Sequence, residues 1–254
     1  MNQTIIQVEN LYAGYHDQAI MEDLTFDIEK GEIFVILGGS GCGKSTVLKH
    51  MIGLLPPVSG RVLINGQDMV SATGKSRIRL LRQIGVAFQN SALFGSMSVL
   101  ENITLPLKEF TRLPEDGVTT IARAKLGLVD LAGKGHLLPG ELSGGMKKRA
   151  AIARAIALDP AIVFLDEPSA GLDPLTSAEI DLLIMDLAKT LGITFVIVTH
   201  ELESIFTIAD TVIMLEKDTR GIIARGNPND LKADTSNAYA YQFFNRKPKR
   251  DKKP

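Results

Sequence analysis

The sequence predicts an α/β fold whose core is a mostly parallel sheet. Two runs rich in β-branched residues, AIVFL (161–165) and ITFVIVT (193–199), have the length of buried strands and lie between segments with helical spacing. A third apolar run, EIFVILGGS (32–40), ends in a glycine loop, after which CGKSTVLKHMIGLL becomes helical. Because ligands gather at the carboxyl ends of the strands in such sheets, we expect the functional residues there.

Length and charge narrow the class of protein. The chain has 254 residues, which is enough for one large domain with a subdomain. The 28 Lys and Arg residues balance the 29 Asp and Glu residues, which gives a net charge of −1. The chain as a whole therefore lacks the positive charge that would indicate a nucleic-acid partner. Cys42 is the only cysteine, and the N-terminus lacks the regions of a secretory signal. We therefore expect a reducing cytoplasm and, with no run near roughly 20 apolar residues, no membrane span.

The remaining segments surround this core. Residues 4–30 and 60–69 contain shorter strands joined by turns, which predicts an antiparallel flank. Residues from about 90 to 158 have helical spacing and predict a helical subdomain inserted into the core. We place the main domain at residues 1–238 and a basic C-terminal tail at residues 239–254.

Local signals also mark where single elements begin and end. Ser98 and Glu101 form a capping box at the start of one helix. Asp173 followed by Pro174 predicts the start of another helix, and Gly192 predicts its end. A hairpin-like segment, EKDTRGIIARGNP, leads to the last helix.

The strongest chemical signal is the glycine loop after the strand 32–40. It satisfies G-x-x-x-x-G-K-[ST], a pattern in which successive backbone N–H groups turn inward around phosphates. Lys44 can reach the outer phosphates, and the hydroxyl of Ser45 can bind magnesium. The strand before the loop and the helix after it argue against a plain glycine-rich turn. The predicted phosphate-binding residues are Gly38, Gly39, Ser40, Gly41, Cys42, Gly43, Lys44, Ser45 and Thr46.

Two carboxylates, Asp166 and Glu167, end the apolar strand that begins at Ile162. Acids at the exposed end of a buried strand are costly unless they meet a cation or take part in proton transfer. We expect Asp166 to hold magnesium through its shell and Glu167 to polarise the attacking water as general base. The alternative is a helix-capping pair, because EPSAGLDP has a turn-like composition.

Gln89 and His200 also follow strand-like runs, IGVAF and ITFVIVT. Each alone is typical of a locally satisfied turn residue. Together with the phosphate loop and the two acids, they predict a site in which Gln89 senses the metal or the water and His200 reaches the γ-phosphate. Tyr15 is a candidate for stacking on a base, with ordinary packing as the alternative.

A second helix start also has the composition of an anion site. In ELSGGMKKRA (141–150), a serine and two glycines precede a helix-forming run of basic residues and alanines. The unpaired N–H groups and the positive dipole end of such a helix attract phosphate. A complete phosphate loop already lies upstream, so the ligand of this second start needs a separate explanation.

The order of these motifs resembles that of the ATP-binding-cassette (ABC) ATPases over about residues 5 to 235. The resemblance implies a P-loop NTPase with a RecA-like core, an antiparallel flank and a helical signature subdomain, which binds and hydrolyses ATP with Mg²⁺. In that family two domains pack head to tail, and each offers its signature to the nucleotide held by the other. The functional unit would be a homodimer or a heterodimer with a related chain. The matching residues are Tyr15, the phosphate loop, Gln89, Ser143, Gly144, Gly145, Asp166, Glu167, Ser169 to Asp173 and His200.

Importer-type ABC ATPases with a single cassette work with a separate integral-membrane permease. The resemblance therefore implies a peripheral subunit on the cytoplasmic side of the inner membrane. After Gln89, the apolar side chains of Leu93, Phe94 and Met97 are candidates for the groove that receives a permease helix. Burial in the helical subdomain is the plainer alternative for at least one of them.

Shorter motifs resemble the MCE-associated (Mla-type) ATPases, which serve phospholipid transport between bacterial membranes. Met146 replaces the usual glutamine of the signature, and ALF, LPL, PGELSGGMKKRAAIARAIALDP and YQFFNRKP match this group, whereas PSAGLDP has the general form. This resemblance implies a phospholipid substrate and an MCE-domain substrate-binding protein as a partner. The alternatives are an importer of another small solute such as amino acids, a soluble ABC ATPase that binds no permease, and a nucleotide clamp without hydrolysis.

Two further expectations concern Cys42 and the basic tail. Cys42 lies inside the phosphate loop, so alkylation of its thiol is expected to block nucleotide entry and bound ATP to protect it. Residues 246–253 contain six basic residues and one acid. We expect a solvated end there, with contact to anionic lipid or to the dimer partner as the alternative.

Overall fold

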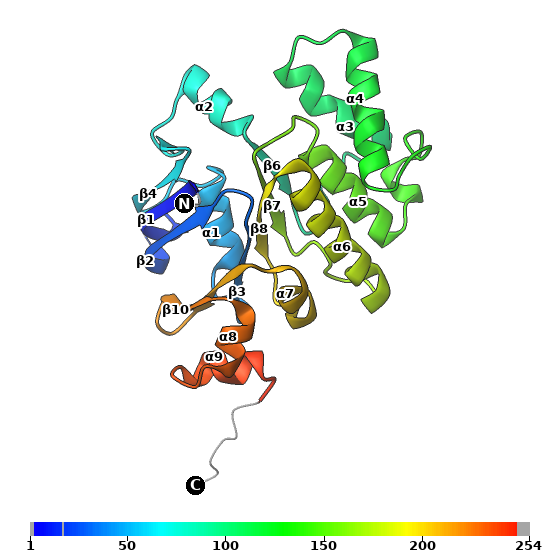
Figure 1. Cartoon of the computed structure of the whole chain (residues 1–254). Coiled ribbons are helices and arrows are strands. Elements are labelled where there is room, and N and C mark those ends of the chain that lie inside the picture. The colour runs from blue at the N-terminus through cyan, green and yellow to red at the C-terminus, as the bar shows by residue number, and fades with distance from the viewer. Residues whose placement is uncertain (1–2, 17, 248–254) are drawn as a thin grey trace.

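The computed structural model describes residues 3–16 and 18–247 of the chain. These residues form two sheets and the helices around them (Figure 1). The strands are β1 Thr4–Tyr15, β2 Gln18–Glu29, β3 Ile33–Gly38, β4 Ser59–Ile64, β5 Gln67–Asp68, β6 Ile84–Ala87, β7 Ile162–Asp166, β8 Thr194–Val198, β9 Thr211–Glu216 and β10 Gly221–Gly226. The helices are α1 Lys44–Met51, α2 Gly74–Leu81, α3 Val99–Phe110, α4 Glu115–Leu128, the 3₁₀ turn η1 Pro139–Glu141, α5 Gly144–Ala155, α6 Pro174–Leu191, α7 Leu202–Ile208, α8 Pro228–Ala233 and α9 Ala238–Phe244.

The larger sheet is the mostly parallel core that the sequence predicts. Its strand order is β10-β9-β3-β8-β7-β6, and every neighbouring pair is parallel except β9 with β10. Both faces of β3 are buried. Val35 and Leu37 pack with helices α3 to α6, whereas Phe34 and Ile36 pack with α1 and the smaller sheet. A strand buried on both faces must be apolar throughout, which explains the continuous hydrophobic runs.

The smaller sheet is the predicted antiparallel flank, with the strand order β2-β1-β4-β5. Phe26 on β2 stacks on Phe34 on β3 with 5.5 Å between the ring centroids, so the two sheets share one apolar layer. Val47, Leu48 and Met51 of α1 are buried in the same layer. Helix α1 is therefore packed against both sheets, and its N-terminus is held firmly beside the end of β3.

The helices α3 to α6 cover the other face of the core sheet (Figure 1). The predicted capping box begins α3: the hydroxyl of Ser98 accepts from the amide of Glu101 (3.2 Å), whose carboxylate accepts from the amide of Ser98 (2.7 Å). The predicted bounds of α6 are also confirmed, because Asp173 caps its start and Gly192 ends it with φ 65°. These local signals succeed because they depend on neighbouring residues alone.

Helix α2 was not expected from the sequence. Its segment GKSRIRLL contains several basic residues, and Leu80 is its only buried residue. The helix has only eight residues, and Thr73 before it makes no side-chain cap hydrogen bond, so no start signal marks it in the sequence.

The C-terminal part also differs from the expectation. The boundary placed after residue 238 falls inside α9, where Ala240 and Phe244 are buried against the core. The packed domain therefore includes α9, and residues 248–254 of the expected tail lie outside the described residues. None of the helices in the described part of the chain is long and apolar enough to cross a bilayer.

Candidate functional site

The phosphate loop joins β3 to α1 at the carboxyl edge of the core sheet. The loop passes close to β9: a Cβ atom on Gly38 would lie 2.4 Å from the carbonyl oxygen of Leu215, so only glycine fits. Lys44 is buried, and its Nζ donates to the carbonyl oxygens of Gly38 (2.9 Å) and Gly39 (3.0 Å). Helix α1 has no side-chain cap. The loop thus combines a buried cation with free N–H groups at a helix start, which is the chemistry of a phosphate site.

A cleft of about 590 Å³ lies against the phosphate loop. It brings together predicted residues from the loop and from the ends of three neighbouring strands: Gln89 after β6, Glu167 after β7 and His200 after β8. Ile20 of β2 and Phe243 of α9 also line it, and no sequence signal marked them, because each is a single apolar residue far along the chain. The whole lining is Ile20, Gly38, Gly39, Ser40, Gly41, Gly43, Lys44, Ser45, Thr46, Gln89, Glu167, His200 and Phe243.

The two predicted magnesium ligands, Ser45 and Asp166, are in contact. The hydroxyl of Ser45 donates to Oδ1 of the buried Asp166 at 3.1 Å. Hydroxyl and carboxylate oxygens are suitable ligands for Mg²⁺, which usually takes one or two protein groups together with substrate phosphates and water. Among the described residues there is no cluster of three or more His, Cys, Asp or Glu side chains that could hold a metal ion by itself. The pair therefore fits Mg²⁺ bound together with a nucleotide.

Glu167 and His200 form the second contact of the cleft. The Nδ1 of His200 lies 2.7 Å from Oε1 of Glu167, and the His200 side chain is 61% exposed. The other carboxylate oxygen of Glu167, Oε2, is buried and has no hydrogen-bond partner among the described residues. The backbone of Glu167 is left-handed, with φ 50°. For a residue other than glycine this conformation costs about 1–3 kcal/mol and is typical of functional sites.

Lys148 on α5 also contacts this region, although the sequence analysis did not identify it. Its Nζ donates to the backbone carbonyl oxygens of Gln89 (2.7 Å) and Glu167 (2.9 Å). Burial lowers the pKa of Lys148, and the nearby carboxylates of Glu167 and Asp166 act in the opposite direction. A sequence signal did exist: Lys148 interrupts the buried face of α5, which otherwise consists of glycine and apolar residues at helical spacing.

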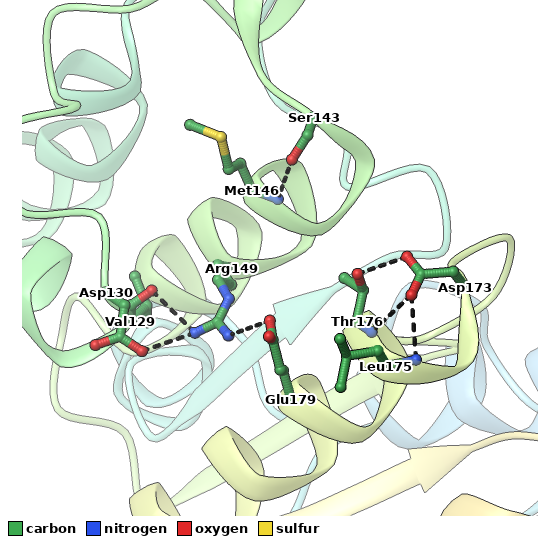
Figure 2. A network of polar contacts seen from close by, with 9 residues as sticks. All are labelled: Val129, Asp130, Ser143, Met146, Arg149, Asp173, Leu175, Thr176 and Glu179. Atoms are coloured by element: carbon green, nitrogen blue, oxygen red, sulfur yellow. Dashed lines mark hydrogen bonds and ion pairs between the residues drawn. The ribbon is translucent and has the colours of Figure 1, made fainter.

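The second helix start lies outside this cleft. Ser143 is exposed and caps α5, with its hydroxyl accepting from the amide of Met146 at 3.3 Å (Figure 2). Neither Ser143 nor the two glycines after it are part of the cleft lining. The structure therefore does not bring the predicted signature residues together with the phosphate loop of the same chain.

The start of α5 is packed tightly against the start of α6. A Cβ atom on Gly145 would lie 2.5 Å from Cγ2 of Thr176, so a larger residue would push the helices apart. One turn further along α5, Arg149 donates to the carboxylates of Asp130 (2.9 Å) and Glu179 (3.2 Å) (Figure 2). The starts of α5 and α6 are thus fixed relative to each other by close packing and by the ion pair of Arg149 with Glu179.

Two other predicted residues, Tyr15 and Cys42, are also outside the cleft lining. Tyr15 is partly exposed and does not line the cleft; its hydroxyl lies 3.4 Å from Oγ1 of Thr46. Cys42 is only 1% exposed, packed in the apolar layer beneath the loop. The expectation of a reactive thiol is therefore wrong for this conformation, because an alkylating agent cannot reach the sulfur. The backbone of Cys42 still belongs to the phosphate loop.

Comparisons with known proteins identify the family. The family model described as "ABC transporter" matches residues 21–170. The probable ribonucleotide transport ATP-binding protein mkl of Mycobacterium leprae is 41% identical over 240 residues, which are 94% of this chain and 68% of that protein. The intermembrane phospholipid transport system ATP-binding protein MlaF of Haemophilus influenzae is 39% identical over 231 residues, or 91% of this chain and 87% of that one.

A solved structure matches the fold as well. The ATP-binding cassette MJ0796, in a dimeric post-hydrolysis state bound to ADP and Pi, superposes with a TM-score of 0.79 at 29% identity and covers 88% of this chain and 98% of that one. A family model that matches more than half of the residues, together with a relative that is similar along nearly the whole sequence, leads to one conclusion. This chain belongs to the ABC transporter family, as an ATP-binding protein that hydrolyses ATP.

Proposed function

We propose that the cleft is the ATP site and that its residues act as their positions suggest. The observation that carries this proposal is the convergence of Lys44, Glu167 and His200 on one cleft at the carboxyl edge of the core sheet. Lys44 would exchange its two carbonyl acceptors for phosphate oxygens, which form stronger charge-assisted hydrogen bonds. Tyr15, at the end of β1, is not among the residues that line the cleft, and it would stack on the adenine base.

Glu167 is the proposed general base. Its unpartnered Oε2 is free to accept the proton of an attacking water, while Oε1 is oriented by His200. The exposed His200 side chain would contact the γ-phosphate, and Gln89 would sense the metal or the water. Ser45 and Asp166 would hold Mg²⁺, which neutralises developing charge on the phosphates when it is bound.

We propose that the unit which hydrolyses ATP is a dimer of two such domains, either two copies of this chain or a pair with a related chain. The support is the exposed position of Ser143, whose helix start is built for an anion yet lies outside the cleft of its own chain. In a head-to-tail pair, Ser143, Gly144 and Gly145 would bind the γ-phosphate held by the other subunit. Loss of that phosphate would weaken the contact and separate the two domains.

A second groove, of about 330 Å³, is the proposed docking site of a membrane permease. Phe94 lines it and is 51% exposed, as expected for a coupling groove, whereas Leu93 packs against the core and Met97 is not among the lining residues. The groove lies between the core sheet and the helical subdomain. A movement of the subdomain would therefore displace a permease helix bound in the groove. Its lining is Leu81, Ile84, Gly85, Val86, Phe94, Leu105, Pro106, Glu109, Phe110, Arg154, Ala155 and Leu158.

We further propose that the transported substrate is a phospholipid, moved between bacterial membranes by a complex with an MCE-domain protein. The support is the likeness to the phospholipid transport ATP-binding protein of H. influenzae, together with Met146 in the signature. Docking to a permease would place the chain at the cytoplasmic face of the inner membrane. A second candidate, ribonucleotide transport, is favoured by the likeness to the probable ribonucleotide transport ATP-binding protein of M. leprae.

The decisive experiment reconstitutes the chain with the integral-membrane protein that co-purifies with it. Proteoliposomes containing a labelled phospholipid would be given ATP, and transfer of the label to acceptor vesicles would be measured beside uptake of a labelled ribonucleotide. We expect ATP-dependent transfer of the phospholipid, lost in the Glu167→Gln variant. Uptake of the ribonucleotide alone would favour the second candidate. An ATPase rate that no membrane partner changes would contradict a transport role.

A further inference from the structure

We propose that Lys148 is a positioning residue for hydrolysis, which holds the backbone of Glu167 and of the Gln89 loop in their working arrangement. The ammonium group bridges two carbonyl oxygens, those of Gln89 (2.7 Å) and Glu167 (2.9 Å). These residues follow β6 and β7, which are neighbours in the core sheet. The inference rests on the proposed role of Glu167 as general base and adds a residue that does not itself touch the substrate.

The backbone of Glu167 gives Lys148 a specific task. With φ 50°, Glu167 occupies a left-handed conformation that persists only where the surroundings enforce it. Its amide donates to the carbonyl oxygen of Val198 on β8 at 2.8 Å, and its carbonyl oxygen accepts from the amide of Ala170 at 3.3 Å and from Lys148 at 2.9 Å. The strained residue is therefore held from both sides of its backbone. Without Lys148, the carbonyl keeps only the longer bond from Ala170 among these contacts, so the strained backbone that positions the carboxylate is held less firmly.

The surroundings of Lys148 agree with this task. Lys148 is only 9% exposed, and two of the three donors of its ammonium group are used by the two carbonyls. The carboxylates of Glu167, Asp166 and Glu201 are close enough to stabilise its positive charge electrostatically. A buried lysine that bonds to backbone carbonyls, with carboxylates nearby, is suited to fixing a loop. It is poorly suited to binding a solvent-exposed partner.

The same helix also carries the signature residue. Ser143 caps α5, and Lys148 lies five residues further along, which corresponds to roughly 7.5 Å of helix axis. Because α5 is a continuous helix, a displacement of its start by a bound neighbour would move Lys148 as well. The contact that one subunit offers to its neighbour's nucleotide is thereby linked to the position of its own Glu167.

The test compares three variants of the full chain: Lys148→Met, which removes the donors; Lys148→Arg, which keeps them; and Lys147→Met as a matched control. Lys147 lies beside Lys148 on α5 and is partly exposed, and its side chain makes no hydrogen bond or ion pair to the described residues. Steady-state kcat and KM for ATP would be measured, with equilibrium binding of a fluorescent ATP analogue. We expect Lys148→Met to lower kcat by about 10- to 100-fold, with nucleotide affinity within about twofold of the parent. Lys148→Arg and Lys147→Met should keep kcat near the parental value.

Two results would overturn the inference. One is a kcat for Lys148→Met within about twofold of the parent, since a misplaced general base must slow the chemical step. The other is a parallel loss of kcat and nucleotide affinity that Lys148→Arg does not rescue, which would indicate a merely structural lysine. If Lys148→Met does not fold, Lys148→Gln replaces it with the same expectation of a lowered kcat. The proposed site itself is tested separately, by an active parent and an inactive Glu167→Gln variant. If that test succeeds, a parental kcat for Lys148→Met would contradict the role of Lys148 alone.

Discussion

The starts of α1 and α5 are two helix N-termini with similar local chemistry and very different surroundings. At α1 the loop follows a buried strand, Lys44 lies inside it, and the helix has no side-chain cap, so its N–H groups remain available to a ligand. At α5 the serine is exposed, and its hydroxyl already accepts from the amide of Met146. One start is surrounded by a cleft from the same chain. The other lies outside that cleft.

The difference arises from where each helix meets the core sheet. Helix α1 begins at the carboxyl edge of β3, where the ends of β6, β7 and β8 supply the other groups of the cleft. Helix α5 begins after the turn η1, and the side chain of its Lys148 donates to the carbonyl oxygens of Gln89 and Glu167 at that edge. An N-terminal dipole attracts phosphate in both cases, but the dipole alone is a weak and screened contribution. The surrounding groups decide whether a helix start is a complete site.

The largest expected effect tests whether ATP is hydrolysed in the cleft at the start of α1. Replacing Glu167 with Gln removes the proton acceptor without changing the shape of the side chain. We expect hydrolysis to fall by about 10²- to 10⁴-fold, the usual contribution of a general base, with ATP binding retained. Single-turnover hydrolysis and equilibrium binding measure the two quantities. Hydrolysis at the parental rate would remove Glu167 from the mechanism.

The next effect concerns affinity at the α1 start. Lys44→Met keeps the length of the side chain and removes its charge. We expect ATP affinity to fall by about 10- to 100-fold, because hydrogen bonds to charged groups contribute about 1.5–3 kcal/mol. Lys49→Met is the matched control, since Lys49 is also on α1 and its side chain makes no hydrogen bond to the described residues. Equal losses in the two variants would mean that Lys44 has no special role.

A smaller effect is expected at the α5 start. Ser143→Ala should leave ATP binding by the isolated chain unchanged and lower hydrolysis by about tenfold, because one hydrogen bond to the nucleotide is lost. Mixing this variant with Lys44→Met provides a sharper measurement. If each signature serves the other subunit, one site of a mixed dimer combines the intact Lys44 of one protein with the intact Ser143 of the other. The mixture should then hydrolyse ATP faster than either variant alone. Mixtures that remain as inactive as their components would place both helix starts in the same subunit's site.

The last expected effect is on stability, and it concerns helix α6, which packs against the α5 start. Asp181 on α6 is only 4% exposed, and burial raises its pKa from 3.8 to about 6. Because the folded state holds this proton more tightly than the unfolded state, stability should fall as the pH rises through about 4 to 6. The loss should approach about 3 kcal/mol above pH 7.

The matched variant for this pH effect is Asp181→Asn, which cannot titrate. Urea unfolding at pH 5 and pH 7.5 should show a smaller difference for the variant than for the parent. Identical pH slopes would mean that Asp181 titrates normally in the folded chain.

The parts of the fold that could be predicted from the sequence depend on short-range chemistry. The buried runs became β7 and β8, and the cap residues Ser98, Asp173 and Gly192 lie where α3 and α6 begin or end. Helix α2 lacked such a signal because its face is mostly exposed. The boundary after residue 238 was misplaced because the basic residues that follow α9 suggested a tail, whereas Phe244 is buried.

The sequence by itself determined which chemical groups the site contains: a glycine loop with its lysine, acids at a strand end, and a second helix start with serine and glycine. Local spacing is enough for this, because each motif is formed by consecutive residues with its own backbone requirements. Only the tertiary structure decided that Cys42 is buried, that Ile20 and Phe243 line the cleft, and that Lys148 reaches Glu167. These contacts join segments far apart in the chain, and the packing of the two sheets and the helical subdomain brings them together.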